Sequence, residues 1–92
     1  MTYVIQYSEF ITRKRFSKIP KSDRVRIHRA IVEKLAEHPD IFGKPLRLSL
    51  WGSWSLRVGE YRVIYRIEGK TVQVILFGHR STIYQEAKDI LG

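Results

Sequence analysis

Hydrophobic and polar positions alternate with the period of a β-strand in several parts of the chain. Such segments are rich in β-branched and aromatic residues, and we expect strands over residues 2–7, 48–58, 61–68 and 71–78. Turn residues at Gly59-Glu60 and at 68–70 separate the last three segments. These three should therefore form consecutive antiparallel strands.

Between the first strand and the later ones, apolar residues recur with helical spacing. Ser8 followed by Glu9 indicates the N-cap and first-turn acid of a helix that ends near Pro20. A second helix is predicted over residues 21–39, where Pro39 stops it. Its apolar face consists of Ile27, Ala30, Ile31 and Leu35. The two helices should pack together as a hairpin.

A last helix is predicted from Ser81 or Thr82 to Leu91, with Thr82 and Gln85 as a capping box. The order of elements is then βααβββα, and no repeat or linker divides residues 1–92. This order predicts a single α+β domain: a small antiparallel or mixed β-sheet with an N-terminal helix hairpin on one face. We expect the helices to cover that one face of the sheet.

The charge balance narrows the choice of partners. The 92 residues hold 17 Lys and Arg against 9 Asp and Glu, which gives a formal net charge of +8 and a pI near 10.1. So large an excess of positive charge favours a polyanion: nucleic acid, an anionic membrane surface or an acidic protein. Nucleic acid is the first expectation for a folded domain of this composition.

Several other classes of function are disfavoured. The chain has no cysteine, which excludes disulfides and zinc–thiolate sites. His28 and His38 lie ten residues apart without a set of carboxylate ligands beside them, so we expect neither a metal nor another cofactor. The first ten residues lack the features of a secretory signal, and the longest apolar run, VILF, is too short to span a bilayer. We therefore expect a cytoplasmic protein with no membrane partner.

The hairpin LRVGEYRVIYR, residues 56–66, carries an unusual concentration of positive charge. A two-residue turn at Gly59 would place Arg57 directly opposite Arg62. Like charges that face each other across a sheet are destabilising, and no acidic residue of the hairpin has the parity to separate them. The pair is best explained by an anion bound between the two guanidinium groups.

The next turn, at Gly69-Lys70, sets the pairing of the following strand. We expect three apolar pairs on the helix-covered face: Val63 with Leu76, Tyr65 with Val74, and Ile67 with Val72. This register leaves four residues on the opposite face: Arg57, Arg62, Arg66 and His79. Planar guanidinium groups bind phosphate oxygens through two hydrogen bonds and stabilise a phosphorane transition state.

Residues just after the last strand can complete such a phosphate site. Arg80 would act as a further phosphate donor, and Tyr84 supplies a phenol that can donate or accept a proton. For any one of these residues a structural role is the alternative, and Tyr84 at a helix start commonly packs. No metal is required by this chemistry.

Two further features suit RNA but have simpler explanations as well. The run from Arg13 to Arg29 holds eight Lys and Arg and one Asp, which is typical either of a phosphate-backbone footprint or of a solvated helix face. The candidate RNA-binding residues are Lys14, Arg15, Lys18, Lys21, Arg24, Arg26, Arg29, Lys44 and Arg66. Trp51 and Trp54 could stack on bases, although packing is the more common role for at least one of them.

With these residues in view, the chain resembles the RelE/ParE superfamily of toxins from toxin–antitoxin pairs. The resemblance extends over the element order and is most specific in residues 42–67 and 78–87, above all in LRVGEYRVIY and HRSTIY. For the RelE branch it implies an mRNA interferase, a metal-independent endoribonuclease that cuts messenger RNA in the ribosomal A site. The 2′-hydroxyl attacks the adjacent phosphate, leaving a 2′,3′-cyclic phosphate and a 5′-hydroxyl. It also implies an inhibitory antitoxin from an adjacent gene, which this basic chain predicts to be acidic.

The resemblance also implies roles for the candidate catalytic residues. Arg62 matches the arginine that stabilises the transition state, and Arg57 matches one that holds phosphate. Arg80 would bind phosphate, and Tyr84 would stack on a base or assist proton transfer. His79 lies in the family's basic segment after the last strand, and its imidazole is our candidate general acid or base because imidazole exchanges protons near neutral pH.

The chain departs from the RelE pattern in its candidate base. Some RelE enzymes have two lysines where this chain has Ser53 and Ser55, and others have a glutamate in a loop that here, at residues 41–47, contains no acid. Lys44 is a possible electrostatic substitute. Two alternatives therefore stand beside the interferase: a ParE-like inhibitor of DNA gyrase without RNase activity, and a nonenzymatic nucleic-acid-binding protein.

Overall fold

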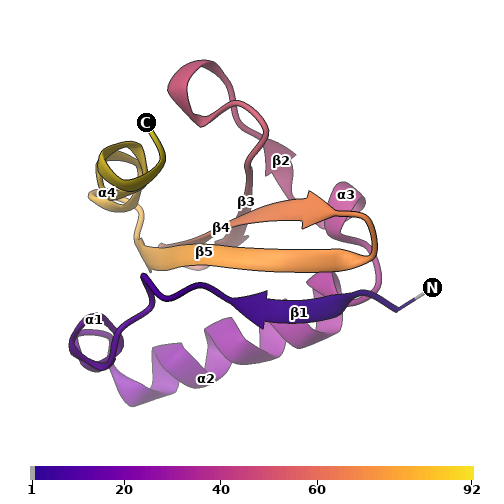
Figure 1. The fold of residues 1–92 in the computed structure, drawn as a ribbon. Coiled ribbons are helices and arrows are strands. Elements are labelled where there is room, and N and C mark those ends of the chain that lie inside the picture. The colour runs from indigo at the N-terminus through magenta and orange to yellow at the C-terminus, as the bar shows by residue number, and fades with distance from the viewer. Residues whose placement is uncertain (1) are drawn as a thin grey trace.

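The structure, a computed structural model, describes residues 2–92. These residues form one mixed sheet with helices on both of its faces (Figure 1). The strands are β1 Val4–Tyr7, β2 Lys44–Pro45, β3 Trp54–Val58, β4 Tyr61–Glu68 and β5 Thr71–His79. The helices are α1 Arg13–Ser17, α2 Lys21–Ala30, α3 Pro39–Phe42 and α4 Ile83–Leu91, with a π-helical turn at Ile31–Leu35 and a 3₁₀ turn at Leu48–Leu50. None of the helices in residues 2–92 has the length and apolar character needed to cross a bilayer.

The sheet has the order β1-β5-β4-β3-β2, in which β1 runs parallel to β5 and the other neighbours are antiparallel. Helices α1 and α2 form a hairpin against one face. The predicted α+β fold, with a mixed sheet and an N-terminal helix hairpin, is confirmed.

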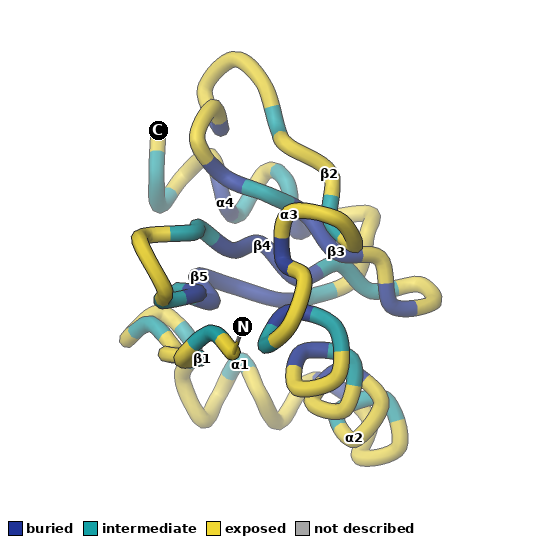
Figure 2. The backbone as a smooth tube through the Cα atoms, turned by 90° about the vertical axis from the view of Figure 1, so that its right-hand side faces the viewer, coloured by how far each residue is buried: buried dark blue, intermediate teal, exposed yellow. Residues whose placement is uncertain are grey.

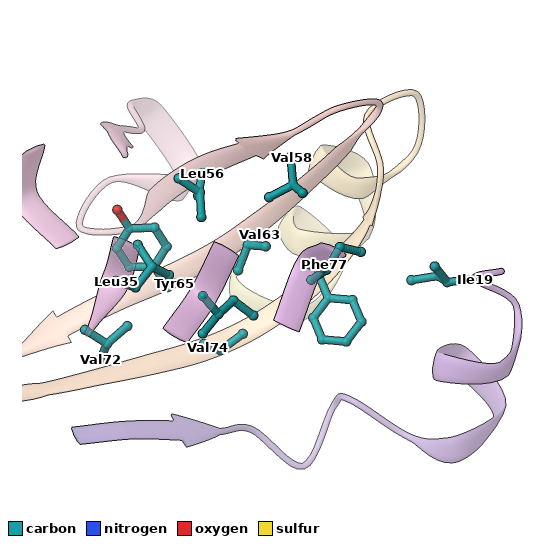
Figure 3. Close-up of a cluster of buried hydrophobic side chains, with 11 residues drawn as sticks. Ile19, Leu35, Leu56, Val58, Val63, Tyr65, Val72, Val74 and Phe77 are labelled. Atoms are coloured by element: carbon teal, nitrogen blue, oxygen red, sulfur yellow. The ribbon is translucent and has the colours of Figure 1, made fainter. Parts of the chain in front are cut away.

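The main core lies between the sheet and the helix hairpin. Ile27, Ile31 and Leu35, which were predicted to form one helical face, are all buried there, and Ala30 packs at its edge. They cover the inward residues of β4 and β5, among them Tyr65 (Figure 3). Figure 2 shows buried residues concentrated in these two strands, whereas the outer turns of α2 are exposed.

A second, smaller core lies on the opposite face of the sheet, under α4. Ile83 and Ala87 of α4 are fully buried against Ile64 and Leu76. The expectation that the helices cover one face was therefore wrong. Ile83 and Ala87 are four residues apart, so they form one apolar side of α4, and the outward apolar residues of β4 and β5 give that side a partner.

The segment predicted as a strand over residues 48–58 is extended only from Trp54 onward. Residues 46–53 form a loop that projects above the face occupied by α4 (Figure 1). Leu48 and Gly52 both have positive φ, 56° and 92°, which breaks the extended backbone. The loop closes on itself, since the N–H of Ser53 donates to the Leu50 carbonyl oxygen at 3.0 Å, and Leu50 is buried under α4.

The cap predicted at Ser8 was wrong, whereas Thr82 occupies the N-cap position of α4 as expected but forms no capping box. Thr12, not Ser8, caps the first helix, and its hydroxyl accepts a hydrogen bond from the Arg15 N–H at 3.2 Å. The Ser8 hydroxyl instead donates to the carbonyl oxygen of Ile75 at 2.5 Å, which ties the end of β1 to β5. At α4 the Thr82 side chain makes no capping bond, and the amide of Gln85 reaches forward along the helix to Asp89.

A β-bulge alters the predicted register between β4 and β5. The pairs Arg57–Arg62, Tyr65–Val74 and Ile67–Val72 are confirmed, but Val63 lies opposite Phe77 and not Leu76. The register shift falls between Ile64 and Tyr65, and it leaves Ile75 and Leu76 both in the core under α4. Every side chain of β5 after this point is therefore turned to the opposite face from the one predicted.

Candidate active site

A cavity of about 370 Å³ opens on the face of the sheet that carries α4, and we call it the arginine cavity. It is bounded by β2, β3, β4 and the first turn of α4. Its lining residues are Phe42, Lys44, Pro45, Leu46, Ser55, Arg57, Arg62 and Tyr84. Three of the predicted site residues, Arg57, Arg62 and Tyr84, are therefore brought together, and Lys44 lies with them.

Arg57 and Arg62 occupy directly opposite positions on β3 and β4. The left-handed backbone of Gly59, φ 59°, closes the tight turn that fixes this pairing. One terminal nitrogen of Arg62 donates to the carbonyl oxygens of Gly59 and Tyr61, at 3.0 and 2.9 Å. Neither arginine has a carboxylate partner within residues 2–92, so two positive charges face each other without neutralisation.

Tyr84 and Lys44 approach the arginines from two sides. The Tyr84 hydroxyl lies 3.0 Å from the Ser55 hydroxyl, and its ring packs on the edge of the core under α4. Lys44 lies opposite Ser55 on the neighbouring strand and is exposed. The cavity thus combines three cationic groups with a phenol that is held in place by a hydrogen bond.

Ser55 was not predicted as a site residue, because it was considered only as a replacement for a lysine. Its position two residues before Arg57 on the same strand was the available signal, since residues i and i+2 share one face of a sheet. Phe42 and Leu46 were also missed. They reach the cavity from the segments before and after β2, which no periodic pattern marks.

His79 does not join the arginines, and the prediction that it lies on their face was wrong. It lies opposite Tyr61, with the two rings in an edge-to-face contact at a centroid distance of 5.9 Å. The physical cause is the bulge at Ile75, because the extra residue moves the later side chains of β5 to the opposite face of the sheet. His79 therefore faces the helix hairpin and lines a different cavity, together with residues of α1.

Arg80 and Arg66 also lie outside the arginine cavity. The Arg80 side chain pairs with the carboxylate of Glu60 at 2.7 Å, and its backbone N–H donates to the Glu60 carbonyl oxygen at 2.9 Å. These contacts attach the segment after β5 to the tip of the arginine hairpin. Arg66 is half-buried and donates to the hydroxyl of Ser53 at 3.1 Å.

The candidate RNA-binding residues of α1 and α2 lie on the other side of the sheet from the arginine cavity. Arg15 pairs with Glu86, Arg26 lies 3.6 Å from Asp23, and the Arg24 guanidinium lies over the Phe16 ring at 4.9 Å. The remaining four are exposed, and they are Lys14, Lys18, Lys21 and Arg29.

The two tryptophans have different environments. Trp54 is half-buried and stacked on Tyr65, with ring centroids 6.4 Å apart. Trp51 is 78% exposed on the loop of residues 46–53. Of the two, Trp54 has the packing role, and Trp51 is free to contact a partner.

Tyr61 connects the arginine hairpin to the helix hairpin. Desolvation by burial raises the pKa of Tyr61, and its hydrogen bond to Asp23 raises that pKa further. The phenol therefore stays protonated, and its hydroxyl donates a hydrogen bond to the Asp23 carboxylate of α2 at 3.2 Å.

Within residues 2–92 no three His, Asp or Glu side chains gather as a metal site would require.

Comparison with known proteins adds the family context. Residues 12–84 match the family described as "ParE toxin of type II toxin-antitoxin system, parDE". The chain is 36% identical to Toxin RelG of Mycobacterium tuberculosis over 91 residues, which cover 92% of this chain and 99% of that toxin.

Solved structures show the same fold. A toxin–antitoxin complex, RelBE2 of M. tuberculosis, superposes with a TM-score of 0.77 at 30% identity, covering 87% of this chain and 93% of that chain. A mutant of the E. coli toxin RelE in the free state has a TM-score of 0.73 at 26% identity, with full coverage of both chains.

Proposed function

Since this chain belongs to the RelE/ParE superfamily and is the toxin of a type II toxin–antitoxin system, we propose that it cleaves messenger RNA on the ribosome. Its protein partner is an antitoxin, as the family membership implies. The observation that carries the proposal is the pair Arg57 and Arg62, which face each other without a carboxylate in a cavity that also holds Tyr84.

The proposed reaction is attack of a 2′-hydroxyl on the adjacent phosphorus. The bond from the 2′-oxygen to phosphorus forms, and the bond from phosphorus to the 5′-oxygen breaks. Two phosphate oxygens gain negative charge in the transition state, and Arg57 and Arg62 are arranged to stabilise it. The products are a 2′,3′-cyclic phosphate and a 5′-hydroxyl.

Proton transfer in this scheme involves Tyr84. The 2′-hydroxyl releases its proton to water, and the Tyr84 phenol gives its own proton to the departing 5′-oxygen before it is reprotonated from solvent. No carboxylate or imidazole lines the arginine cavity in residues 2–92. The centre therefore acts mainly by stabilising charge, with Lys44 adding a third positive group.

Replacing Tyr84 with phenylalanine tests its role in proton transfer. The variant keeps the aromatic ring, which packs against the edge of the smaller core, and loses only the hydroxyl. We expect the cleavage rate at saturating ribosomes to fall about 100-fold while binding is unchanged. Tyr7→Phe, on the outer strand β1, is the matched control and should leave the rate unaltered. A Tyr84→Phe enzyme as fast as wild type would remove Tyr84 from the chemistry.

Trp51 provides a nucleobase contact beside the cavity in this proposal. Its loop lies over the same sheet face, and base stacking on an aromatic ring contributes about 1–3 kcal/mol. In a Trp54→Phe background Trp51 is the sole tryptophan, so its fluorescence should be quenched by a 2′-O-methylated RNA. Trp51→Ala should weaken binding of that RNA by about 5- to 150-fold. Unquenched fluorescence with bound RNA would show that Trp51 does not stack.

The basic residues distributed over both faces are proposed to bind ribosomal or messenger RNA through phosphates. Under this proposal the affinity of the protein for RNA falls as the salt concentration rises, because each phosphate contact releases counterions. An acidic antitoxin segment that covers the arginine cavity would occupy the same charges and thereby inhibit the toxin. Because its proposed substrate is messenger RNA on the translating ribosome, the proposed place of action is the cytoplasm.

A gyrase inhibitor is the second candidate, and the ParE description of the matched family favours it. That function would leave the arginine cavity without a chemical role. It predicts blocked DNA supercoiling and intact messenger RNA, whereas the interferase predicts the reverse. A nonenzymatic nucleic-acid-binding protein would show neither effect, and Arg62→Ala would alter only its affinity.

A further inference from the structure

A second cavity lies at the same end of the sheet as the arginine cavity but on the opposite face. Its volume is about 450 Å³, and it is enclosed by α1, the ends of β4 and β5, and the start of α4. We call it the His79 cavity, and its polar lining includes Lys14, Arg15, Lys18, Tyr61, His79 and Glu86. The mechanism above uses none of these side chains.

The two cavities are close neighbours in the register of the sheet. Arg62 lies opposite Gly78, and the next pair along the ladder is Tyr61 with His79. Because adjacent residues of a strand point to opposite faces, Arg62 and His79 leave the sheet on its two sides at nearly the same height. A chain that crosses this end of the sheet can touch both.

His79 is oriented as a hydrogen-bond donor. The backbone N–H of Ser81 donates to its Nδ1 at 3.1 Å, and the Ser81 hydroxyl lies 2.8 Å from the same nitrogen. With Nδ1 occupied as an acceptor, the neutral ring carries its proton on Nε2. The edge-to-face contact with Tyr61 also fixes the ring orientation.

The remaining polar groups of the His79 cavity favour an anion. Glu86 is the one acid among the lining residues, and it is paired with Arg15, which links α4 to α1. Lys14 and Lys18 have no carboxylate partner within residues 2–92. The hydroxyl of Thr82 adds another donor. Two free ammonium groups and an imidazole N–H therefore surround a space in which the one carboxylate is already neutralised.

We propose that the His79 cavity is a second phosphodiester-binding site, which holds a phosphate of the RNA backbone other than the scissile one. This inference rests on the proposed function, because the arginine cavity is taken to hold the scissile phosphate. His79 is then a binding residue that fixes the path of the RNA around the end of the sheet.

NMR of the histidine side chains tests the proposal directly. The probe is a short, fully 2′-O-methylated RNA, which cannot be cleaved. We expect the His79 ring signals to shift on titration, whereas those of His28 and His38 stay in place because these residues lie elsewhere. The ring signals of Tyr84 report the arginine cavity in the same spectra.

The outcomes separate the two proposals. Shifts of both Tyr84 and His79 support the second site. A shift of Tyr84 with an unmoved His79 would overturn it and leave the proposed function standing, whereas no shift of either would contradict both. Titration with inorganic phosphate alone tests whether the site prefers free phosphate to the RNA backbone. Inorganic phosphate should shift the His79 ring signals only at a far higher concentration than the RNA does.

Two variants and one control variant provide independent measurements. Lys18→Gln should lower the slope of log affinity against log salt by about one, and Lys70→Gln, in the turn at the far end of β4, should leave the slope unaltered. His79→Ala should raise the KM for ribosomes several-fold with an unchanged kcat. An unaltered slope for Lys18→Gln, or a His79→Ala enzyme that has lost its kcat, would refute a pure binding site.

Discussion

Arg62→Ala should lower the rate of ribosome-dependent cleavage by about 100- to 1,000-fold, the usual effect of removing one donor that stabilises transition-state charge. The guanidinium of Arg62 is anchored to the backbone of its own hairpin, which fixes it in place before substrate arrives. Its loss would leave Arg57 alone on the phosphate. The rate is measured by primer extension on a defined message at saturating ribosomes.

The fold should survive this substitution. Arg62 is half-buried and its side-chain hydrogen bonds are local, so the melting temperature should change little. Arg62→Lys keeps the charge without the planar fork and should be intermediate in rate. Lys70→Ala, at the other end of β4, controls for loss of positive charge in general. Wild-type cleavage by a folded Arg62→Ala protein would contradict the site assignment.

Gly43→Ala should destabilise the protein by about 2–3 kcal/mol, because it overfills a closed part of the core. A Cβ at Gly43 would overlap the hydroxyl oxygen of Tyr65 and lie 2.8 Å from its Cζ. Tyr65 cannot move away, since it is fully buried and its hydroxyl donates to the Pro39 carbonyl oxygen at 2.5 Å. Burial, with a smaller contribution from the nearby Asp40, raises the pKa of Tyr65, which keeps that donor protonated.

A double substitution separates this clash from other effects. Tyr65→Phe alone should cost about 1–2 kcal/mol, because it leaves the Pro39 carbonyl without its partner. The double variant Gly43→Ala with Tyr65→Phe lacks the overlapping oxygen. Its loss of unfolding free energy should therefore be smaller than the sum of the losses in the two single variants. Urea unfolding of the four proteins measures this coupling. Strict additivity would show that the predicted overlap does not determine the stability of the Gly43→Ala protein.

The part of the site that follows from local sequence was predictable. Gly59 fixes a two-residue turn, and alternation along the strand then determines that Arg57 lies opposite Arg62. The apolar face of α2 and of the π-helical turn after it followed from helical spacing. For the hairpin one periodic pattern and one turn residue were enough, and for the helical face the periodic pattern alone was enough.

The bulge at Ile75 could not be read from the same pattern. Ile75, Leu76 and Phe77 are consecutive apolar residues, and such a run has no alternation that would mark an extra residue. The bulge is stabilised by tertiary contacts, because it places both Ile75 and Leu76 under α4. Its consequence is functional: it moves His79 out of the arginine cavity and into a cavity of its own.

The position of α4 explains why Ser55 was not predicted as a site residue. The sequence shows that residues 83–91 are amphipathic, but it does not say which face of the sheet they cover. Once α4 lies over Ile64 and Leu76, Tyr84 reaches Ser55 and completes the arginine cavity. Ser55 itself is buried and polar, and its role became evident only with this partner.

If the arginine cavity cleaves RNA on the ribosome, the cut ends must carry the chemistry of attack by the 2′-hydroxyl. A defined message is incubated with the wild-type protein, with and without purified translating ribosomes, and the products are mapped by primer extension and mass spectrometry. We predict discrete cuts in the A site that require ribosomes and leave 2′,3′-cyclic phosphate and 5′-hydroxyl ends. Intact message in the presence of folded protein, together with inhibited supercoiling by DNA gyrase, would contradict this prediction.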